Sequence, residues 1–123
     1  MSGRDLYERA VAVAQRAYAP YSKYAVGAAV RTTDGKVHEG VNVENAAYPL
    51  GVCAEKSAIV RAVSEGYGPG QIEAIAITAS PCGGCRQWLH EFRIAEVTFP
   101  DAAGEVVTRS VEQLLPESWD LPG

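Results

Sequence analysis

Hydrophobic residues recur along the N-terminal part of this chain at spacings that change from helical to extended. An apolar stripe over residues 5–18 predicts an amphipathic helix, which Pro20 ends. Residues 25–30 (AVGAAV) are small and apolar without alternation, as in a strand that is covered on both faces. Asp34-Gly35 then predicts a tight hairpin turn that leads into the next strand.

The second strand of this hairpin is expected at about residues 36–44, where valines alternate with polar residues. We expect the valines to face the core. Asn42 and Glu44 then point together to the opposite face as a pair of hydrogen-bonding groups. His38 lies on their face, and we expect both it and His90 to be solvated surface residues.

The remainder of the chain alternates between helical and extended patterns. Helices are predicted at about residues 53–65, from the turn at 80–84 to residue 93, and at 110–115; strands are predicted at 72–78, 96–99 and 106–108. The order α-β-β-α-β-α-β-β-α predicts an α/β layered domain with one mixed sheet, a hairpin first and helical crossovers after it.

Composition fits one folded domain spanning residues 1–123. The chain is 47% hydrophobic and 21% charged, so it can bury enough apolar surface to offset its ordering entropy. A net charge of −4 argues against a nucleic-acid partner. The apolar runs are far shorter than the roughly 20 residues of a membrane-spanning helix. Charges within the first 18 residues also argue against a secretory signal, and we expect a cytoplasmic location.

The three cysteines, Cys53, Cys82 and Cys85, all lie within one stretch of the chain. Because three is an odd number, disulfides cannot use them all, and a reducing compartment is indicated. The Cys82-x-x-Cys85 spacing suits one zinc ion, although a redox pair has the same spacing. With a third cysteine, zinc becomes the better interpretation. Neither histidine has an obvious ligand spacing, and three protein ligands with one open position are typical of a catalytic zinc.

A carboxylate follows the first of these cysteines. Glu55 lies two residues after Cys53, about 200° further around a helix, so it is badly placed to share the metal. It can instead lie beside a metal-bound water and act as a base. Zinc with three thiolates carries a net negative charge, which helix N-termini, Lys56 and Arg86 are candidates to offset. Plain surface charge is the alternative role for Lys56 and Arg86.

Four segments together resemble the small, homotetrameric, zinc-dependent cytidine deaminases. They are NVENAAYPLGVCAEKSA (42–58), SPCGGCRQWLHEF (80–92), YAPYSKYAVGAAV (18–30) and LLPESW (114–119). The resemblance implies a three-layer α-β-α sandwich around a mixed five-stranded sheet, and one zinc ion per subunit. It further implies hydrolytic deamination of cytidine and 2′-deoxycytidine to uridine and 2′-deoxyuridine, with release of ammonia.

The same resemblance assigns roles to individual residues. Glu55 would take a proton from the zinc-bound water, pass it to N3 of the cytosine ring and then to the departing amino group, as in zinc deaminases generally. The backbone N–H of Ala54 would hold the ring carbonyl. Asn42 and Glu44 would bind the ribose hydroxyl, and Tyr24 would lie against the nucleoside.

Two further positions are implied to act between subunits. Tyr48 and Trp119 fall where members of this family contribute groups to a neighbouring subunit's site. The chain also departs from the family pattern, because Lys56 stands where an arginine is common and Trp119 where a phenylalanine is usual. A lysine offers charge without the planar fork of arginine.

Three other functions compete with this interpretation. The chain could deaminate a related cytosine-containing nucleoside, although Asn42 and Glu44 favour a plain sugar. A polynucleotide-editing deaminase is disfavoured by the acidic balance and by the lack of a basic, aromatic-rich tract. A purely structural zinc module would have no use for Glu55.

Overall fold

A single mixed β-sheet organises the computed structural model, which describes residues 1–122. Its strands are β1 (Gly27–Thr32), β2 (Val37–Val41), β3 (Ile72–Ile77), β4 (Glu96–Pro100) and β5 (Val106–Arg109). They lie in the order β2-β1-β3-β4-β5. Only β3 and β4 pair in parallel among these strands, and the other neighbours are antiparallel. The predicted five-stranded mixed sheet is confirmed.

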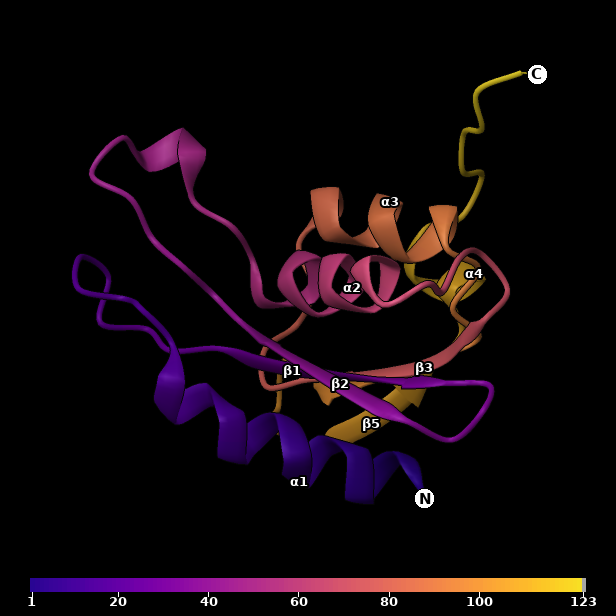
Figure 1. The fold of residues 1–123 in the computed structure, drawn as a ribbon, viewed down its shortest axis with the longest axis horizontal. Helices are drawn as coiled ribbons and strands as arrows, with labels where there is room; N and C mark the ends of the chain where they lie inside the picture. Colours follow the sequence, from indigo (N-terminus) through magenta and orange to yellow (C-terminus); the bar gives the residue numbers. More distant parts are fainter. Residues whose placement is uncertain (123) are drawn as a thin grey trace.

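Helices cover both faces of the sheet. Helix α1 (Gly3–Val13) lies on one face, and α2 (Ala54–Ser64) and α3 (Gly83–Glu91) lie on the other, with the short α4 (Val111–Leu114) beside α3 (Figure 1). The result is the three-layer α-β-α sandwich that the resemblance implied. Within residues 1–122 no helix has both the length and the apolar character needed to cross a membrane.

The hydrophobic core is split by the sheet into two unequal clusters. The larger one joins the sheet to α2, α3 and α4, and the smaller one joins it to α1 through Leu6, Ala10 and three strand alanines. The backbones of α1 and α2 pack directly against glycines of the sheet. A Cβ on Gly27 would lie 2.1 Å from the Ala10 carbonyl oxygen, and one on Gly40 would lie 2.3 Å from the Ala58 nitrogen. Only glycine permits these approaches.

Element boundaries differ from the sequence-based ones by a few residues. Helix α1 starts at Gly3 because Ser2 and Asp5 form a capping box, and its α-helical turns end at Val13 before a 3₁₀ turn, η1 (Ala14–Arg16). Strand β1 begins two residues later than expected. Strand β2 ends at Val41, three residues early, because the chain turns away there to form an arm.

Two expectations about the second strand were wrong. Because α2 covers the polar face of β2, His38 is 5% exposed and Gly40 is also buried, while Val37 and Val41 on the other face are only partly buried. His38 Nδ1 lies 2.5 Å from Glu65 Oε2, and its ring packs 5.1 Å from that of Tyr67. A partner carboxylate and an aromatic neighbour thus accommodate a histidine in the core. His90 is partly exposed and pairs with Asp120 across 2.8 Å.

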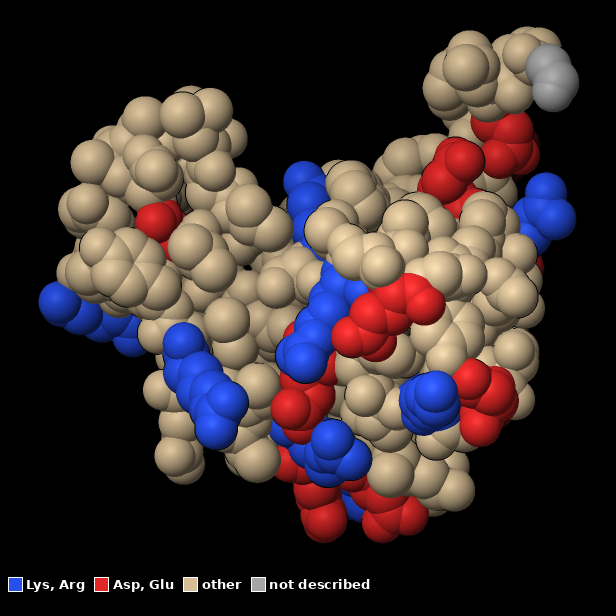
Figure 2. Space-filling model, viewed as in Figure 1, with Lys and Arg blue, Asp and Glu red and all other residues tan. Residues whose placement is uncertain are grey.

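An arm stands away from the layered body (Figure 1). It is formed by residues 43–52, which include the 3₁₀ turn η2 (Tyr48–Leu50), and by the neighbouring loop 18–24. A β-bridge between Tyr18 and Val43 joins the two parts, and one between Val43 and Val52 closes the base of the arm. The space-filling view shows the molecule hollowed between this arm and the helical layer (Figure 2).

Candidate active site

Three cysteine side chains meet where two helices begin. Cys53 is the N-cap of α2, Cys82 is the N-cap of α3, and Cys85 lies in the first turn of α3. Their sulfur atoms all lie within 4.8 Å of one another. Among residues 1–122 this is the only group of three or more metal-ligating side chains so placed, and both histidines lie outside it.

This donor set fits zinc. Zn–S bonds of about 2.3 Å at tetrahedral angles place sulfurs about 3.8 Å apart, so the observed spacing needs only a small closure. Burial raises the pKa of the Cys85 thiol and, less strongly, that of Cys53. The Cys85 N–H, 3.5 Å from Cys82 Sγ, instead lowers the pKa of Cys82. A bound cation would stabilise all three thiolates, which otherwise repel one another.

A buried carboxylate adjoins the thiols. Glu55 lies in the first turn of α2 and is 5% exposed. Desolvation is the main cause of a raised pKa at Glu55, and hydrogen bonding with its own backbone and with Cys85, together with the charge of Lys56, acts in the opposite direction. A carboxyl whose pKa is shifted toward neutrality can both accept and return a proton.

Two of the thiols, those of Cys53 and Cys82, and the Glu55 carboxylate border a hollow of about 210 Å³. Four separate segments line it, and they contribute Tyr24, Val26, Asn42, Cys53, Ala54, Glu55, Ala79, Ser80 and Cys82. We call this the thiol hollow. Four positions assigned from the sequence (Tyr24, Asn42, Ala54 and Glu55) therefore lie with two of the cysteines around one cavity, although Tyr24 and Glu55 are 31 residues apart in the chain.

A second hollow of about 230 Å³ adjoins the first. Its lining residues belong to the arm and its root, and they are Asn42, Val43, Glu44, Asn45, Tyr48, Gly51, Val52 and Cys53. We call this the arm hollow. Asn42 and Cys53 line both hollows, so the two spaces share a border at these residues.

The side chains of Asn42 and Glu44 brace the neighbouring loop. Asn42 Oδ1 accepts a hydrogen bond from the Val26 N–H at 2.8 Å, and its Nδ2 donates to the Tyr24 carbonyl at 2.9 Å. Glu44 accepts from the backbone N–H groups of Tyr21 and Ser22 at 3.0 and 3.1 Å. The pair therefore fixes the segment that carries Tyr24.

The sequence of residues 2–100 matches the family described as "Cytidine and deoxycytidylate deaminase zinc-binding region". The chain belongs to this deaminase family. A cytidine deaminase from Sporosarcina psychrophila is 40% identical over 85% of this chain and 82% of its own length. One from Halalkalibacterium halodurans is 39% identical over 97% of this chain and 95% of its own.

Solved structures agree with the family assignment. The crystal structure of cytidine deaminase from Burkholderia pseudomallei has a TM-score of 0.90 and 43% identity, covering 97% of this chain and all of that one. Cytidine deaminase from Mycobacterium tuberculosis has a TM-score of 0.85 and 35% identity, covering 98% and 99% of the two chains. The similarity thus extends over the whole layered domain and the arm.

The two cationic residues predicted to tune this deaminase-family site have different surroundings. Lys56 Nζ lies 5.8 Å from the centre of the Trp88 ring, and its charge acts to lower the pKa of both Cys53 and Glu55. Arg86 instead donates to the carbonyls of Pro81 and Leu114 at 2.9 and 3.0 Å. It ties the turn before Cys82 to the end of α4.

The two positions that the family resemblance assigned to subunit contacts are both exposed. Tyr48 is 74% exposed and lines the arm hollow of its own chain. Trp119 is 64% exposed on the C-terminal tail, where its carbonyl accepts from Gln87 Nε2 at 3.2 Å. Trp119 lines neither hollow of its own chain.

Several lining residues were missed by reading the sequence. Ala79 and Ser80 lie between the end of β3 and Cys82. Their position next to the Cys82-x-x-Cys85 pair could have indicated that they line the site. Asn45 lies at the start of the arm. Ser22, which lines neither hollow, hydrogen-bonds Glu44. No sequence pattern indicates this contact, because the two residues are 22 positions apart in the chain.

Proposed function

We propose that this chain catalyses the zinc-dependent hydrolytic deamination of cytidine and 2′-deoxycytidine to the corresponding uridines and ammonia. One observation carries the proposal: the buried Glu55 carboxyl and the thiols of Cys53 and Cys82 border the same hollow as Tyr24 and Asn42. The relatives of 39–43% identity, all described as cytidine deaminases, support the choice of substrate.

The metal is held by Cys53, Cys82 and Cys85, one zinc ion per subunit. When bound, zinc supplies Lewis-acid activation of a water molecule, as in other zinc deaminases. The helix starts of α2 and α3 direct partial positive charge at the thiolates, and Lys56 adds a full charge nearby. Arg86 acts indirectly, because it fixes the turn that carries Cys82.

Glu55 carries the proton. Its carboxylate takes a proton from the attacking water and delivers it to N3 of the pyrimidine as the hydroxyl adds to C4. It then takes the remaining proton of that hydroxyl and gives it to the amino group, so that the C4–N bond breaks, ammonia leaves and C4 becomes a carbonyl, in keeping with the general acid–base role of the glutamate in zinc deaminases. Burial suits it to this work, since a raised pKa allows the same group to be protonated and deprotonated within one turnover. The Ala54 N–H, at the start of the same helix, holds the ring carbonyl.

The shape of the site favours a free nucleoside. The thiol hollow receives the base beside Tyr24, and the arm hollow receives the sugar beside Glu44 and Tyr48. Asn42 and Glu44 bind a sugar hydroxyl. On the face drawn in Figure 2, acidic and basic side chains are interspersed and form no continuous basic track for a nucleic-acid strand.

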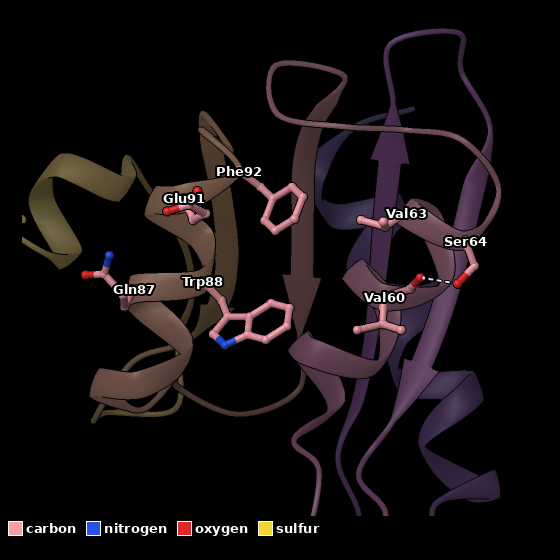
Figure 3. Close-up of a pocket in the computed structure, with 7 residues that line it drawn as sticks. All are labelled: Val60, Val63, Ser64, Gln87, Trp88, Glu91 and Phe92. Atoms are coloured by element: carbon pink, nitrogen blue, oxygen red, sulfur yellow. Dashed lines mark hydrogen bonds between the residues drawn. The ribbon is translucent and has the colours of Figure 1, made fainter. Parts of the chain in front are cut away.

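We also propose that four copies of the chain assemble. A groove of about 410 Å³ runs between α2 and α3, where Val60 and Val63 face Trp88 and Phe92 (Figure 3). Val60 and Val63 are 48% and 43% exposed. The arm is apolar and exposed as well, so assembly would bury both surfaces and bring Tyr48 and Trp119 to neighbouring sites.

Other parts of the biological setting follow from the same features. Three free thiols fit a reducing compartment, which supports a cytoplasmic location. Release of a reusable pyrimidine nucleoside fits a role in salvage. The shared sheet and its two core clusters support one domain over residues 1–123.

The decisive experiment is absorbance-monitored deamination of cytidine by the purified protein, with zinc counted per chain. We expect turnover and about one zinc per subunit. Glu55→Gln should keep the zinc, and its kcat should fall about 10²- to 10⁴-fold. Unchanged turnover in this variant would contradict the role of Glu55. Fast turnover of a modified cytosine nucleoside without turnover of cytidine would favour the related-substrate alternative.

A further inference from the structure

The Ser22 side chain lies between two groups of the proposed sugar-binding region. Its Oγ contacts Glu44 Oε2 and also accepts a hydrogen bond from the Tyr24 N–H at 3.0 Å. The backbone N–H of Ser22 and that of Tyr21 both donate to the other carboxylate oxygen, Glu44 Oε1. One short loop therefore supplies three donors to a single carboxylate.

The position of the hydroxyl proton follows from these contacts. An ionised carboxylate can only accept hydrogen bonds, so the Ser22 hydroxyl donates its one proton to Glu44 Oε2 and accepts from Tyr24 with a lone pair. The same bond is the main reason why the pKa of Glu44 lies below its usual value. Glu44 is thus an ionised acceptor whose orientation is set from the loop.

Counting the lone pairs of Glu44 then restricts what it can bind. A carboxylate oxygen accepts about two hydrogen bonds. Oε1 already receives two N–H groups, and Oε2 receives the Ser22 hydroxyl. One acceptor position remains, on Oε2. A ligand hydroxyl can use that position only while the carboxylate keeps its present orientation.

Resting on the proposed function, we propose that Ser22 is a positioning residue for the sugar: its hydroxyl holds Glu44 so that one lone pair of Oε2 remains free for a substrate sugar hydroxyl. Because Ser22 also accepts from the Tyr24 N–H, the same hydroxyl links the sugar end of the site to the segment that lines the thiol hollow. The Tyr24 carbonyl is held in turn by Asn42.

The test compares the wild type with Ser22→Ala and Ser22→Thr. For each, kcat and KM are measured with cytidine, and inhibition constants with uridine and with 2′,3′-dideoxyuridine, which lacks the ring hydroxyls. We expect Ser22→Ala to raise the KM for cytidine and the inhibition constant of uridine about three- to tenfold. Its kcat should stay within twofold, and its inhibition constant for dideoxyuridine should not change. Ser22→Thr, which keeps the hydroxyl, should restore uridine binding.

The possible failures are distinguishable. Wild-type protein that does not deaminate cytidine would contradict the proposed function, and the Ser22 role with it. A wild type that deaminates cytidine, together with an unaffected Ser22→Ala variant, would contradict the Ser22 role alone. Equal weakening of uridine and dideoxyuridine would also overturn it, because that result indicates a general loosening of the loop. Melting temperatures establish that each variant is folded.

Discussion

Gly40 on β2 faces Ala58 on α2 so closely that a Cβ on Gly40 would lie 2.3 Å from the Ala58 nitrogen and 2.8 Å from the Ala54 carbonyl oxygen. This contact seats the first turns of α2, which carry Cys53 and Glu55, on the sheet. The position of the proposed proton carrier is therefore set by a glycine that is absent from both hollows.

Gly40→Ala is expected to destabilise the fold strongly. Since the obstructing atoms belong to the helix backbone, the helix must shift, and we expect a loss of about 3 kcal/mol or more in the free energy of unfolding. Gly83→Ala is the matched control, because a Cβ at Gly83 meets no atom within 4 Å. It should be neutral or stabilise by about 0.4–1 kcal/mol. Urea unfolding of both variants makes the comparison, and equal stabilities would contradict the seating role of Gly40.

Removing the metal should make the thiols react in a fixed order. Cys82 is exposed and has a lowered pKa, Cys53 is intermediate, and Cys85 is buried with a raised pKa. Iodoacetamide should therefore alkylate chelator-treated protein first at Cys82 and last at Cys85. Added zinc should protect all three, whereas added magnesium should not. Peptide mapping measures the order, and alkylation that zinc does not slow would contradict the site.

Acid should weaken one hydrogen-bonded cluster that lies away from the site. Thr32 and Tyr67 donate to Asp34 at 2.6 and 2.5 Å, and these bonds lower the pKa of Asp34 from 3.8 to about 2. A carboxyl with a depressed folded-state pKa stabilises the fold above its unfolded pKa, and this contribution is lost as the pH falls toward the folded value. The stability difference between the wild type and Asp34→Asn should be constant above about pH 5 and shrink between pH 4 and pH 2.

The measurement for Asp34 is the urea midpoint at each pH. Tyr67→Phe provides a second comparison, because it removes one donor and should bring the pKa of Asp34 closer to its usual value. A difference between wild type and Asp34→Asn that does not vary with pH would contradict the proposed coupling.

Assembly should depend on the groove between α2 and α3. A charge buried without a partner at an apolar interface is costly, so Val60→Glu should shift the protein toward smaller species in analytical ultracentrifugation. Val11→Glu is the matched control, because Val11 is also 48% exposed but lies on α1, across the sheet from the groove. Equal dissociation by both variants, or a wild type that sediments as a monomer, would contradict the proposed interface.

Local spacing predicted the parts of the site that depend on neighbours in the chain. Cys82 and Cys85 are three residues apart at one helix start, and Glu55 follows Cys53 by two at another, so local helix geometry sets the spacing within each pair. The meeting of the two helix starts was inferred from the coordination chemistry of zinc and from the family resemblance. Alternation along the chain also predicted that Asn42 and Glu44 point to the same side. Both side chains do hydrogen-bond the same loop, although both residues lie beyond the end of β2.

Contacts between distant segments were not predictable in the same way. Nothing around Ser22 indicates that its hydroxyl meets Glu44, because that contact depends on the folded path of the arm. His38 was expected in solvent because polar residues usually alternate outward on a strand. His38 is buried instead because α2 covers this face of the strand, and its partners Glu65 and Tyr67 lie just beyond the C-terminal end of that helix.

The border that the two hollows share at Asn42 has a consequence for stereochemistry. Because Asn42 lines both hollows, a nucleoside must place its base in one hollow and its sugar in the other across this residue. We expect only one configuration at the glycosidic carbon to allow both placements together. We therefore expect the site to be chiral in its selection, so that the α-anomer of cytidine presents its sugar away from Glu44 even though its base is identical.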